Sequence, residues 1–259
     1  MAAKIHPTAI ISDKATIANS VEIGPYSIIG DEVEIGENTW VGPHVVIKGP
    51  TKIGSGNRIF QFCSIGDETQ HTSEQKNISS LTIGDNNTFR ECCTINRGSD
   101  QGINDTRIGS NNFIMAYVHI AHDCIVGNNI IFANNASLAG HVIVEDFAIL
   151  GGFTGIHQFC RVGSHVMTGI ATISFKDIPP YLMVSGNTAQ PYGLNSRGLK
   201  SRGFSDETIK AIKKSYKLLY RSGLTQEKAL EEIAPLAEKF PEVEHFHAFV
   251  RKTERGIIR

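Results

Sequence analysis

The sequence predicts an all-β fold, a parallel β-helix of short stacked strands, followed by a small α-helical domain. A β-branched aliphatic residue occupies every sixth position in the first part of the chain. These positions are Ile5, Ile11, Ile17, Ile23, Ile29, Ile35, Val41, Ile47, Ile53, Ile59 and Ile65. A period of six fits neither an α-helix nor a simple alternating strand, but is typical of hexapeptide solenoids. The period ends after about Ser174 and an amphipathic helical pattern follows. We therefore expect a β-helix over residues 1–187 and a helical domain over residues 188–259.

Two interruptions in the repeat predict loops that leave the coil. They lie near residues 67–80 and 96–107 and are rich in Asp, Asn, Gln, Ser and Gly. The aliphatic series resumes at Ile83 and, shifted by one residue, at Ile108. It then continues with a period of six to Val162. The coil is thus expected to run on past both loops.

Three helices are expected in the C-terminal part. Ser205 is placed to cap the first, which carries acidic residues in its first turn and Gly223 after its end. Thr225 can open a second helix, which we expect Pro235 to interrupt. Pro241 can open the third, because proline is favoured at the first helical position.

Composition excludes several classes of protein. The 259 residues carry a formal net charge of −1, so no basic excess points to a nucleic-acid partner. No apolar run is long enough for a transmembrane segment, and the N-terminal stretch MAAKIHPTAIIS lacks the pattern of a signal peptide. The five cysteines form no CxxC pair, which favours a reducing, cytoplasmic setting. Four of them occupy the small inward position of the repeat and are expected in the core: Cys63, Cys93, Cys124 and Cys160.

The repeat predicts that residues far apart in the sequence meet along one edge of the coil. If one turn of the coil takes three hexapeptides, residues eighteen apart are stacked. His122 then lies over Gly140 and Gln158, and Asp123 lies over His141. His119 and His157 are expected in the same region, because His119 lies three residues before His122 and His157 directly precedes Gln158.

The residue types alone leave three interpretations of this cluster open. It can be a hydrated surface seam without function. Three or four imidazoles can bind zinc with an open position, as in a lyase of the carbonic anhydrase type. Alternatively, one imidazole can act as a general base while Asp123 fixes its tautomer.

Several stretches of the chain resemble one known family. They are "HIAHDC", "NNASLAGHV", "GGFTGIHQFC", "PPY", "GLNSRGLKSRGFS" and "YRSG", in this order, with "RGIIR" at the end. The hexapeptide pattern resembles the left-handed β-helix acyltransferases, and these stretches resemble the UDP-N-acetylglucosamine acyltransferases of lipid A biosynthesis. The resemblance covers nearly the whole chain and implies a left-handed coil.

The resemblance also implies a reaction and its catalytic residues. Acyl carrier protein delivers a (R)-3-hydroxyacyl thioester, and the 3-hydroxyl of UDP-N-acetylglucosamine attacks it. His122 matches the family's general base, Asp123 orients it, and Gly140 supplies a backbone N–H to the oxyanion. The family acts as a homotrimer with sites between neighbouring chains. No cofactor and no metal is expected, since a thioester is already an activated acyl donor.

Further residues match the family's binding positions. Those expected to bind substrate are Gln70, His71, Ser73, His119, His141, His157, Gln158, Asn195 and Arg202. Those expected to touch the acyl chain are Ile170 and Thr188, and the bulky Ile170 favours a short chain.

The chain departs from the family pattern at some charged positions. His71 and Ser73 stand where the family usually has an aspartate and a lysine, and Ser201 stands where many members have an arginine. Two alternatives therefore stay open: an acceptor with a 3-amino group, or a catalytically inactive paralogue that binds the carrier protein or the sugar nucleotide.

Overall fold

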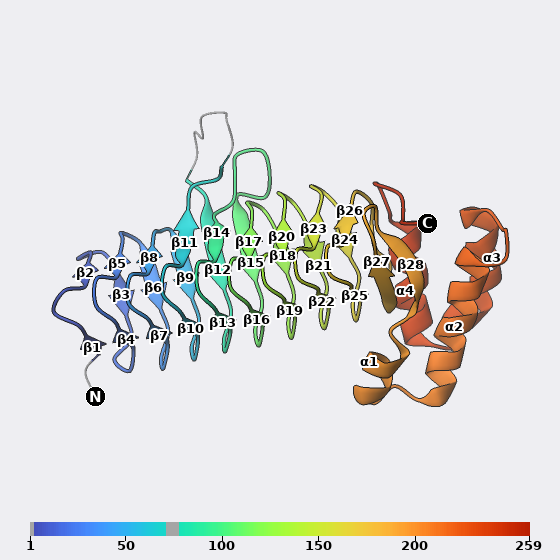
Figure 1. The fold of residues 1–259 in the computed structure, drawn as a ribbon, viewed down its shortest axis with the longest axis horizontal. Coiled ribbons are helices and arrows are strands. Elements are labelled where there is room, and N and C mark those ends of the chain that lie inside the picture. Colours follow the sequence, from blue (N-terminus) through green and yellow to red (C-terminus); the bar gives the residue numbers. More distant parts are fainter. Residues whose placement is uncertain (1–2, 71–77) are drawn as a thin grey trace.

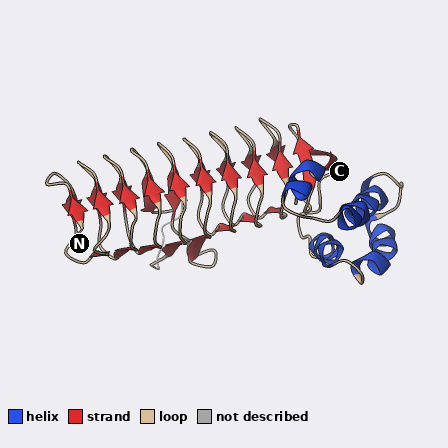
Figure 2. Cartoon of the chain, turned by 90° about the horizontal axis from the view of Figure 1, so that it is seen from below, coloured by secondary structure: helices blue, strands red, loops and turns tan. Residues whose placement is uncertain are grey.

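The chain forms a left-handed parallel β-helix with helices beyond its last coil (Figure 1). This computed structural model describes residues 3–70 and 78–259. His71 and Ser73 lie outside the described residues. Figure 2 shows the strands in rows that run the length of the solenoid, with most of the helical part at one end. The predicted fold class is confirmed.

Within the described residues the strands form three sheets, which are the three faces of the coil. The first sheet, here sheet A, contains β1 Lys4–Ile5, β4 Glu22–Ile23, β7 Trp40–Val41, β10 Arg58–Ile59, β13 Thr88–Phe89, β16 Phe113–Ile114, β19 Ile131–Phe132, β22 Ile149–Leu150, β25 Met167–Thr168, β27 Leu182–Ser185 and β28 Gln190–Leu194. Sheet B contains β2 Ile10–Ile11, β5 Ile28–Ile29, β8 Val46–Ile47, β11 Ser64–Asp67, β14 Thr94–Asn96, β17 His119–Ile120, β20 Ser137–Leu138, β23 Gly155–Ile156 and β26 Ile173–Ser174. Sheet C contains β3 Thr16–Ile17, β6 Val33–Ile35, β9 Thr51–Ile53, β12 Ser80–Ile83, β15 Asp105–Ile108, β18 Ile125–Val126, β21 Ile143–Val144 and β24 Arg161–Val162.

The sixfold aliphatics build the core. The second residue of most strands points inward, as Ile47, Ile65 and Ile120 do with 0% of their surface exposed. Strands one coil apart pair in parallel, so Ile120 lies beside Leu138. The cysteines expected in the core are indeed buried: Cys63, Cys93, Cys124 and Cys160. Burial raises the pKa of Cys124 to about 12, so its thiol stays protonated.

Three edges join the faces and carry the turns. The histidine edge, between sheets B and C, comprises residues 121–124, 139–142 and 157–160. The cap edge, between sheets C and A, comprises residues 127–130, 145–148 and 163–166. The third edge, between sheets A and B, comprises residues 115–118, 133–136, 151–154 and 169–172. A residue on one edge is therefore separated from the other edges by a whole face of the coil.

Both interruptions of the repeat open at the level of the histidine edge. β11 of sheet B ends at Asp67 and β12 of sheet C begins at Ser80. One coil later, residues 97–104 connect β14 to β15 and form the green loop that rises beside the coil in Figure 1. Each replaces the short turn that other coils have at this edge. The second insertion therefore leaves the coil directly before the one that carries His122.

The C-terminal part closes the solenoid. β27 pairs with β25 in parallel and with β28 in antiparallel fashion, which ends sheet A with a hairpin. The helices that follow are α1 Ser196–Ser201, α2 Asp206–Tyr220, α3 Gln226–Ala237 and α4 Pro241–Arg251. The boundary that we placed between residues 187 and 188 stays a prediction.

The predicted helix starts agree with the structure, and one predicted break does not. Ser205 and Thr225 cap α2 and α3 through their hydroxyls, and Pro241 is the first residue of α4. The break that we expected at Pro235 is wrong, because α3 continues through it to Ala237. Pro235 lies in the last turn, where the missing N–H removes one hydrogen bond without ending the helix. Within residues 3–70 and 78–259, no helix has the length and apolar content that crossing a membrane requires.

Candidate active site

His122 and Asp123 form a hydrogen-bonded pair at a turn of the histidine edge. Nδ1 of His122 lies 2.8 Å from Oδ2 of Asp123. Asp123 adopts a left-handed backbone conformation with φ of 59°, as many residues at the turns of the coil do. An ionised carboxylate can only accept hydrogen bonds, so Nδ1 carries the proton. The lone pair of the neutral imidazole is then on Nε2.

Asp123 is fixed by several partners and is only 3% exposed. Burial alone would raise the pKa of its carboxyl group, but the hydrogen bonds from His122 and Ser99 hold that pKa below its usual range. The hydroxyl of Ser99 donates to Oδ2 at 2.6 Å, and the backbone N–H of Asp123 donates to Thr106 Oγ1 at 2.9 Å. Asp123 is thus a buried anion that keeps its charge at neutral pH.

Gly140 lies directly against the imidazole of His122, as the stacking of residues eighteen apart predicts. A β-carbon built on Gly140 would come within 2.5 Å of Cε1 and 2.6 Å of Nε2. Only glycine allows this approach of the ring to the backbone. Among the described residues, the backbone N–H of Gly140 has no acceptor. A hydrogen-bond donor and the basic nitrogen of His122 therefore face the same space.

His141 completes this cluster from the next coil. Its ring contacts that of His122 edge to face, with 5.0 Å between the ring centroids, and stacks on the ring of Phe159, with 4.3 Å between the centroids. Burial lowers the pKa of His141, which favours the neutral ring. Ligand atoms of His122, Asp123 and His141 lie within 4.8 Å of one another, which is the nearest approach to a metal-binding set in the described residues. The hydrogen bond between His122 and Asp123 already uses two of these three groups.

His119 lies on the outer face of sheet B, at one end of an apolar groove. Its Nδ1 shares a hydrogen bond of 2.7 Å with Thr94 Oγ1, and burial lowers the pKa of its ring. The groove has a volume of about 410 Å³ and runs from His119 past Ser137 and Gly155 to Phe175. Ser137 and Gly155 follow His119 in register on successive strands, so small residues form the floor.

His157 and Gln158 lie one coil beyond Gly140. His157 lines the same groove as His119. Arg255, from the C-terminal tail, reaches both residues: its Nη2 lies 3.3 Å from His157 Nδ1 and 3.0 Å from the backbone carbonyl of Gln158. The repeat gave no sign of Arg255, because this residue belongs to the tail. It adds a positive charge to the histidine edge.

Asn195 and Arg202 lie on the cap edge instead. The amide of Asn195 donates to the backbone carbonyl of His165 and its side chain caps α1. The guanidinium of Arg202 stands 4.3 Å over the ring of Phe147. One face of the coil thus separates both residues from His122. They cannot complete the His122 cluster within one chain.

The remaining predicted positions are spread around the coil. Ile170 stands on the third edge and is 72% exposed. Thr188 lines a cavity of about 250 Å³ that shares Ser174 and Phe175 with the apolar groove. Gln70 is exposed, at the start of the first insertion. The cavity at Thr188 therefore adjoins the end of the apolar groove that lies away from His119.

Comparison with known proteins agrees with this architecture. A family model described as UDP-N-acetylglucosamine O-acyltransferase, domain 2, matches residues 177–258, and a bacterial transferase hexapeptide model matches residues 32–67 and 105–140. The chain is 60% identical to the acyl-[acyl-carrier-protein]–UDP-N-acetylglucosamine O-acyltransferase of Thiobacillus denitrificans, over 99% of this chain and 100% of that protein. It is 56% identical to the protein of the same name from a Janthinobacterium species, over 98% and 99% of the two chains. The crystal structure of Francisella novicida UDP-N-acetylglucosamine acyltransferase superposes with a TM-score of 0.96 at 46% identity and covers 98% of this chain and 94% of its own.

Proposed function

Since the chain belongs to the UDP-N-acetylglucosamine O-acyltransferase family, we propose that it transfers a (R)-3-hydroxyacyl group from acyl carrier protein to the 3-hydroxyl of UDP-N-acetylglucosamine, in lipid A biosynthesis. One observation carries the chemical part of this proposal. The His122–Asp123 pair directs a basic imidazole nitrogen toward the backbone of Gly140. This arrangement suits acyl transfer to a hydroxyl, which needs both a base and an oxyanion donor.

His122 acts as the general base. Nε2 takes the proton from the sugar 3-hydroxyl while that oxygen forms a bond to the thioester carbonyl carbon. The carbonyl electron pair moves onto oxygen and gives a tetrahedral intermediate. When the intermediate collapses, the carbon–sulfur bond breaks and His122 returns its proton to the leaving thiolate. The products are the sugar ester and the free thiol of the carrier protein, so protons and electrons balance.

Asp123 and Gly140 support this step from two sides. Asp123 accepts a hydrogen bond from the Nδ1–H of His122, which leaves the lone pair on Nε2 and stabilises the imidazolium as it forms. The N–H of Gly140 donates to the oxygen that becomes negative. General base help contributes about 10²–10⁴ in rate and one oxyanion donor about 10²–10³. The step draws on no metal, because the thioester is already activated.

The groove on sheet B offers a binding site for the acyl chain. It begins at His119, passes His157 and reaches Phe175, where it adjoins the cavity at Thr188. Its walls and floor are mainly apolar, which suits a hydrocarbon chain. We assign His119, His141, His157 and Gln158 to contacts with the sugar nucleotide or the acyl donor. Gln70, His71 and Ser73 are assigned to the sugar by resemblance alone.

We propose that three copies of the chain assemble around a threefold axis. Asn195 and Arg202 are assigned to the nucleotide and its phosphates, yet they lie on the cap edge, away from His122. A neighbouring copy that brings its cap edge to the histidine edge would unite both sets in one cleft. A guanidinium suits this role because it pairs with phosphate oxygens.

The proposed donor also fits the surface of the C-terminal part. Exposed basic residues gather on and around α2: Lys200, Arg202, Lys210, Lys213, Lys214 and Arg221. An acidic carrier protein would be steered to such a surface, with an association rate that falls as salt rises. We propose a cytoplasmic location as well, since acyl carrier protein is the proposed donor.

A product assay tests the proposed function. Purified protein is mixed with UDP-N-acetylglucosamine and a set of (R)-3-hydroxyacyl carrier proteins of increasing chain length, and the products are identified by mass. We expect an acylated UDP-sugar with the wild type and none with His122→Ala. His6→Ala serves as the matched control, because His6 is exposed on the first coil. Product only with a 3-amino acceptor would revise the substrate, and no product with either acceptor would contradict the function.

A further inference from the structure

The second insertion closes over the carboxylate of Asp123. Residues 97–104 leave the coil directly before the one that carries His122. Within this segment Ser99 is only 2% exposed, although residues 101–104 are exposed. The Ser99 hydroxyl donates to Asp123 Oδ2 at 2.6 Å, and the same oxygen accepts the hydrogen bond from His122 at 2.8 Å. Ser99, Asp123 and His122 thus form one continuous hydrogen-bonded chain.

The backbone of Gly102 lies against both oxygens of the same carboxylate. A β-carbon on Gly102 would come within 2.2 Å of Asp123 Cγ and 2.3 Å of Oδ1, so its backbone lies against the carboxylate. Oδ1 is buried and has no hydrogen-bond partner among the described residues. The two oxygens are therefore unequal: Oδ2 accepts the hydrogen bonds from both side chains, and Oδ1 accepts none from the described residues. A partial rotation of the carboxylate about its Cβ–Cγ bond would break both hydrogen bonds at once.

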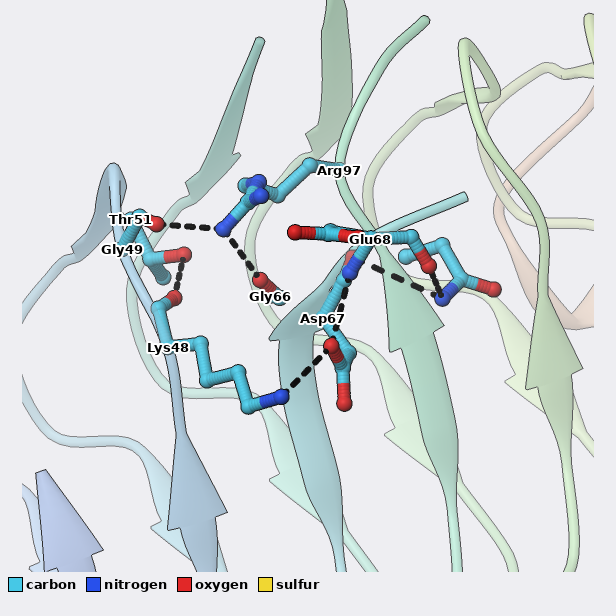
Figure 3. A network of polar contacts seen from close by, with 8 residues as sticks. Lys48, Gly49, Thr51, Gly66, Asp67, Glu68 and Arg97 are labelled. Carbon is cyan, nitrogen blue, oxygen red and sulfur yellow. Dashed lines mark hydrogen bonds and ion pairs between the residues drawn. The ribbon is translucent and has the colours of Figure 1, made fainter. Parts of the chain in front are cut away.

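The base of this loop is anchored to the coil beneath it. Arg97 donates from Nη1 to the backbone carbonyls of Gly49 and Gly66, and its own N–H donates to the carbonyl of Asp67 (Figure 3). These carbonyls belong to two earlier passages of the chain, so the guanidinium ties the loop across successive coils. Ser99 follows Arg97 by only two residues. The anchor therefore limits how far the Ser99 hydroxyl can move from Asp123.

A second set of bonds fixes the first residues of the first insertion, Asp67 and Glu68, at the same point. Asp67 forms an ion pair of 2.9 Å with Lys48 and accepts the backbone N–H of Glu68 (Figure 3). Asn96 donates to the carbonyl of Glu68 at 2.6 Å. The first described residues of the two insertions thus share one polar network.

We propose that Ser99 is a positioning residue for acyl transfer, which holds Asp123 in the one orientation that keeps the Nδ1 proton of His122 in place. The proposal rests on the function proposed above, because it assumes that His122 is the base. Without the hydroxyl, the carboxylate keeps its burial and the backbone contact with Ser99, but loses the side-chain donor that helps to fix its rotation. The imidazole is then held in its reactive orientation for a smaller fraction of the time. Substrate binding is not affected, since Ser99 faces Asp123 and not the cleft.

Three variants separate a positioning role from a structural one. Ser99→Ala removes the hydroxyl, Ser99→Thr keeps it, and Ser12→Ala removes a comparable serine hydroxyl that donates to Asp31 far along the coil. For each, kcat and the KM for UDP-N-acetylglucosamine are measured together with Tm. We expect Ser99→Ala to lower kcat about 10-fold, the factor expected for one hydrogen bond to a charged group, with KM unchanged. Ser99→Thr should restore most of kcat, and Ser12→Ala should leave it unchanged.

The outcomes also separate this inference from the proposed function. If His122→Ala is inactive while Ser99→Ala keeps full kcat, the positioning role is wrong and the function stands. If His122→Ala keeps full activity, the proposed mechanism itself is wrong. If Ser99→Thr is as impaired as Ser99→Ala, or if kcat falls only in proportion to lost folded protein, Ser99 is a structural residue of the loop.

Discussion

The imidazole of His122 lies so close to the backbone of Gly140 that a β-carbon there would stand 2.6 Å from Nε2. Gly140 belongs to the coil after that of His122, and the hexapeptide repeat alone brings the two together. Glycine is therefore required at this position for two reasons. It gives the ring room, and it leaves the backbone N–H accessible to an oxygen atom in the same space.

Gly140→Ala should abolish most of the activity without unfolding the protein. The methyl group would collide with Cε1 and Nε2 of His122, so the ring must turn away from the acceptor hydroxyl. We expect kcat to fall by about 10² or more, the scale of a lost base or oxyanion donor. Circular dichroism and Tm check the fold. Gly152→Ala is the control, because nothing lies within 3.4 Å of a new β-carbon there. Near-normal kcat for Gly140→Ala would argue against the proposed roles of both residues.

Asp123→Asn should impair chemistry more than binding. The amide has nearly the same shape, but its NH₂ group can donate to Nδ1 and so favour the tautomer that carries its proton on Nε2. That tautomer cannot accept the proton of the hydroxyl. We expect kcat to fall by about 10²–10⁴, by analogy with other histidine–aspartate pairs, and the affinity for UDP-N-acetylglucosamine to change little. Steady-state kinetics and calorimetric binding measure the two effects. A loss of affinity with unchanged kcat would assign Asp123 to substrate binding instead.

Complementation between variants tests whether the site lies between chains. His122→Ala and Arg202→Ala change residues on different edges of the coil. If one active site takes His122 from one chain and Arg202 from its neighbour, mixed trimers contain some intact sites. Random assembly from equal amounts gives about a quarter of the sites both native residues. We expect the co-expressed variants to recover activity on that order, while each alone stays impaired.

A mixture no more active than the average of its two components would place both residues in one chain's site, against the cap-edge position of Arg202. Co-expression of His122→Ala with Asp123→Ala is the control. Both residues lie on the same turn, so no mixed trimer gains an intact site. Analytical ultracentrifugation of the wild type separately measures whether the chain is a trimer.

The repeat explains which parts of the site could be predicted from sequence. In a solenoid of constant period, a separation of eighteen residues is also a position in space, so His122, Gly140 and His141 could be placed together. The same arithmetic predicted the buried cysteines. It fails wherever the period breaks. Ser99 and Gly102 lie in an insertion, where no register relates them to Asp123.

The tail residues show a second limit. Arg255 reaches His157 and Gln158 only because the C-terminal segment folds back over the coil. The guanidinium of Arg202 packs on the ring of Phe147, and the hexapeptide repeat does not predict this contact because Arg202 lies outside the repeat. The predicted break at Pro235 is wrong for a related reason. The effect of a proline depends on its place in the helix, and in the last turn of α3 it does not end the helix. Long-range contacts of single residues require the folded structure.

The stability of the protein should fall in acid because of His165. Its ring is 9% exposed and stacks between Phe147 and Tyr181. Burial and the nearby charge of Arg202 lower its pKa from 6.5 to about 4, while Asp146 opposes the shift weakly. Between these values the unfolded chain binds the proton more readily than the folded one. Stability is therefore fully present above pH 6.5 and declines as the pH falls to about 4, by up to about 3 kcal/mol from this group.

His165→Phe should remove the part of the stability loss in acid that His165 causes. Phenylalanine can keep the ring contacts and does not titrate. Urea unfolding of wild type and variant at pH 7.5 and pH 4.5 measures the difference, and His6→Phe on the exposed first coil is the control. We expect the variant to lose less stability than the wild type between the two pH values. An equal loss in both would show that other groups determine the acid sensitivity.

The length of the transferred acyl chain should depend on residues along the groove of sheet B. Gly155 forms the floor, and a β-carbon there would meet Ile173 Cδ1 at 2.9 Å, so Gly155→Val fills the groove partway along. Ile170 stands on the turn that leads into β26, one turn before the groove's far end. We expect Gly155→Val to shift the preferred donor toward shorter chains and Ile170→Gly to shift it toward longer ones, as kcat/KM across a ladder of carrier-protein donors would show. Met183→Ala, an exposed residue on sheet A, should leave the preference unchanged. The two variants can each contradict this prediction. If Gly155→Val lowered kcat/KM equally for all donors, the acyl chain would not lie in this groove. If Ile170→Gly left the preferred chain length unchanged, Ile170 would not limit the length of the acyl chain.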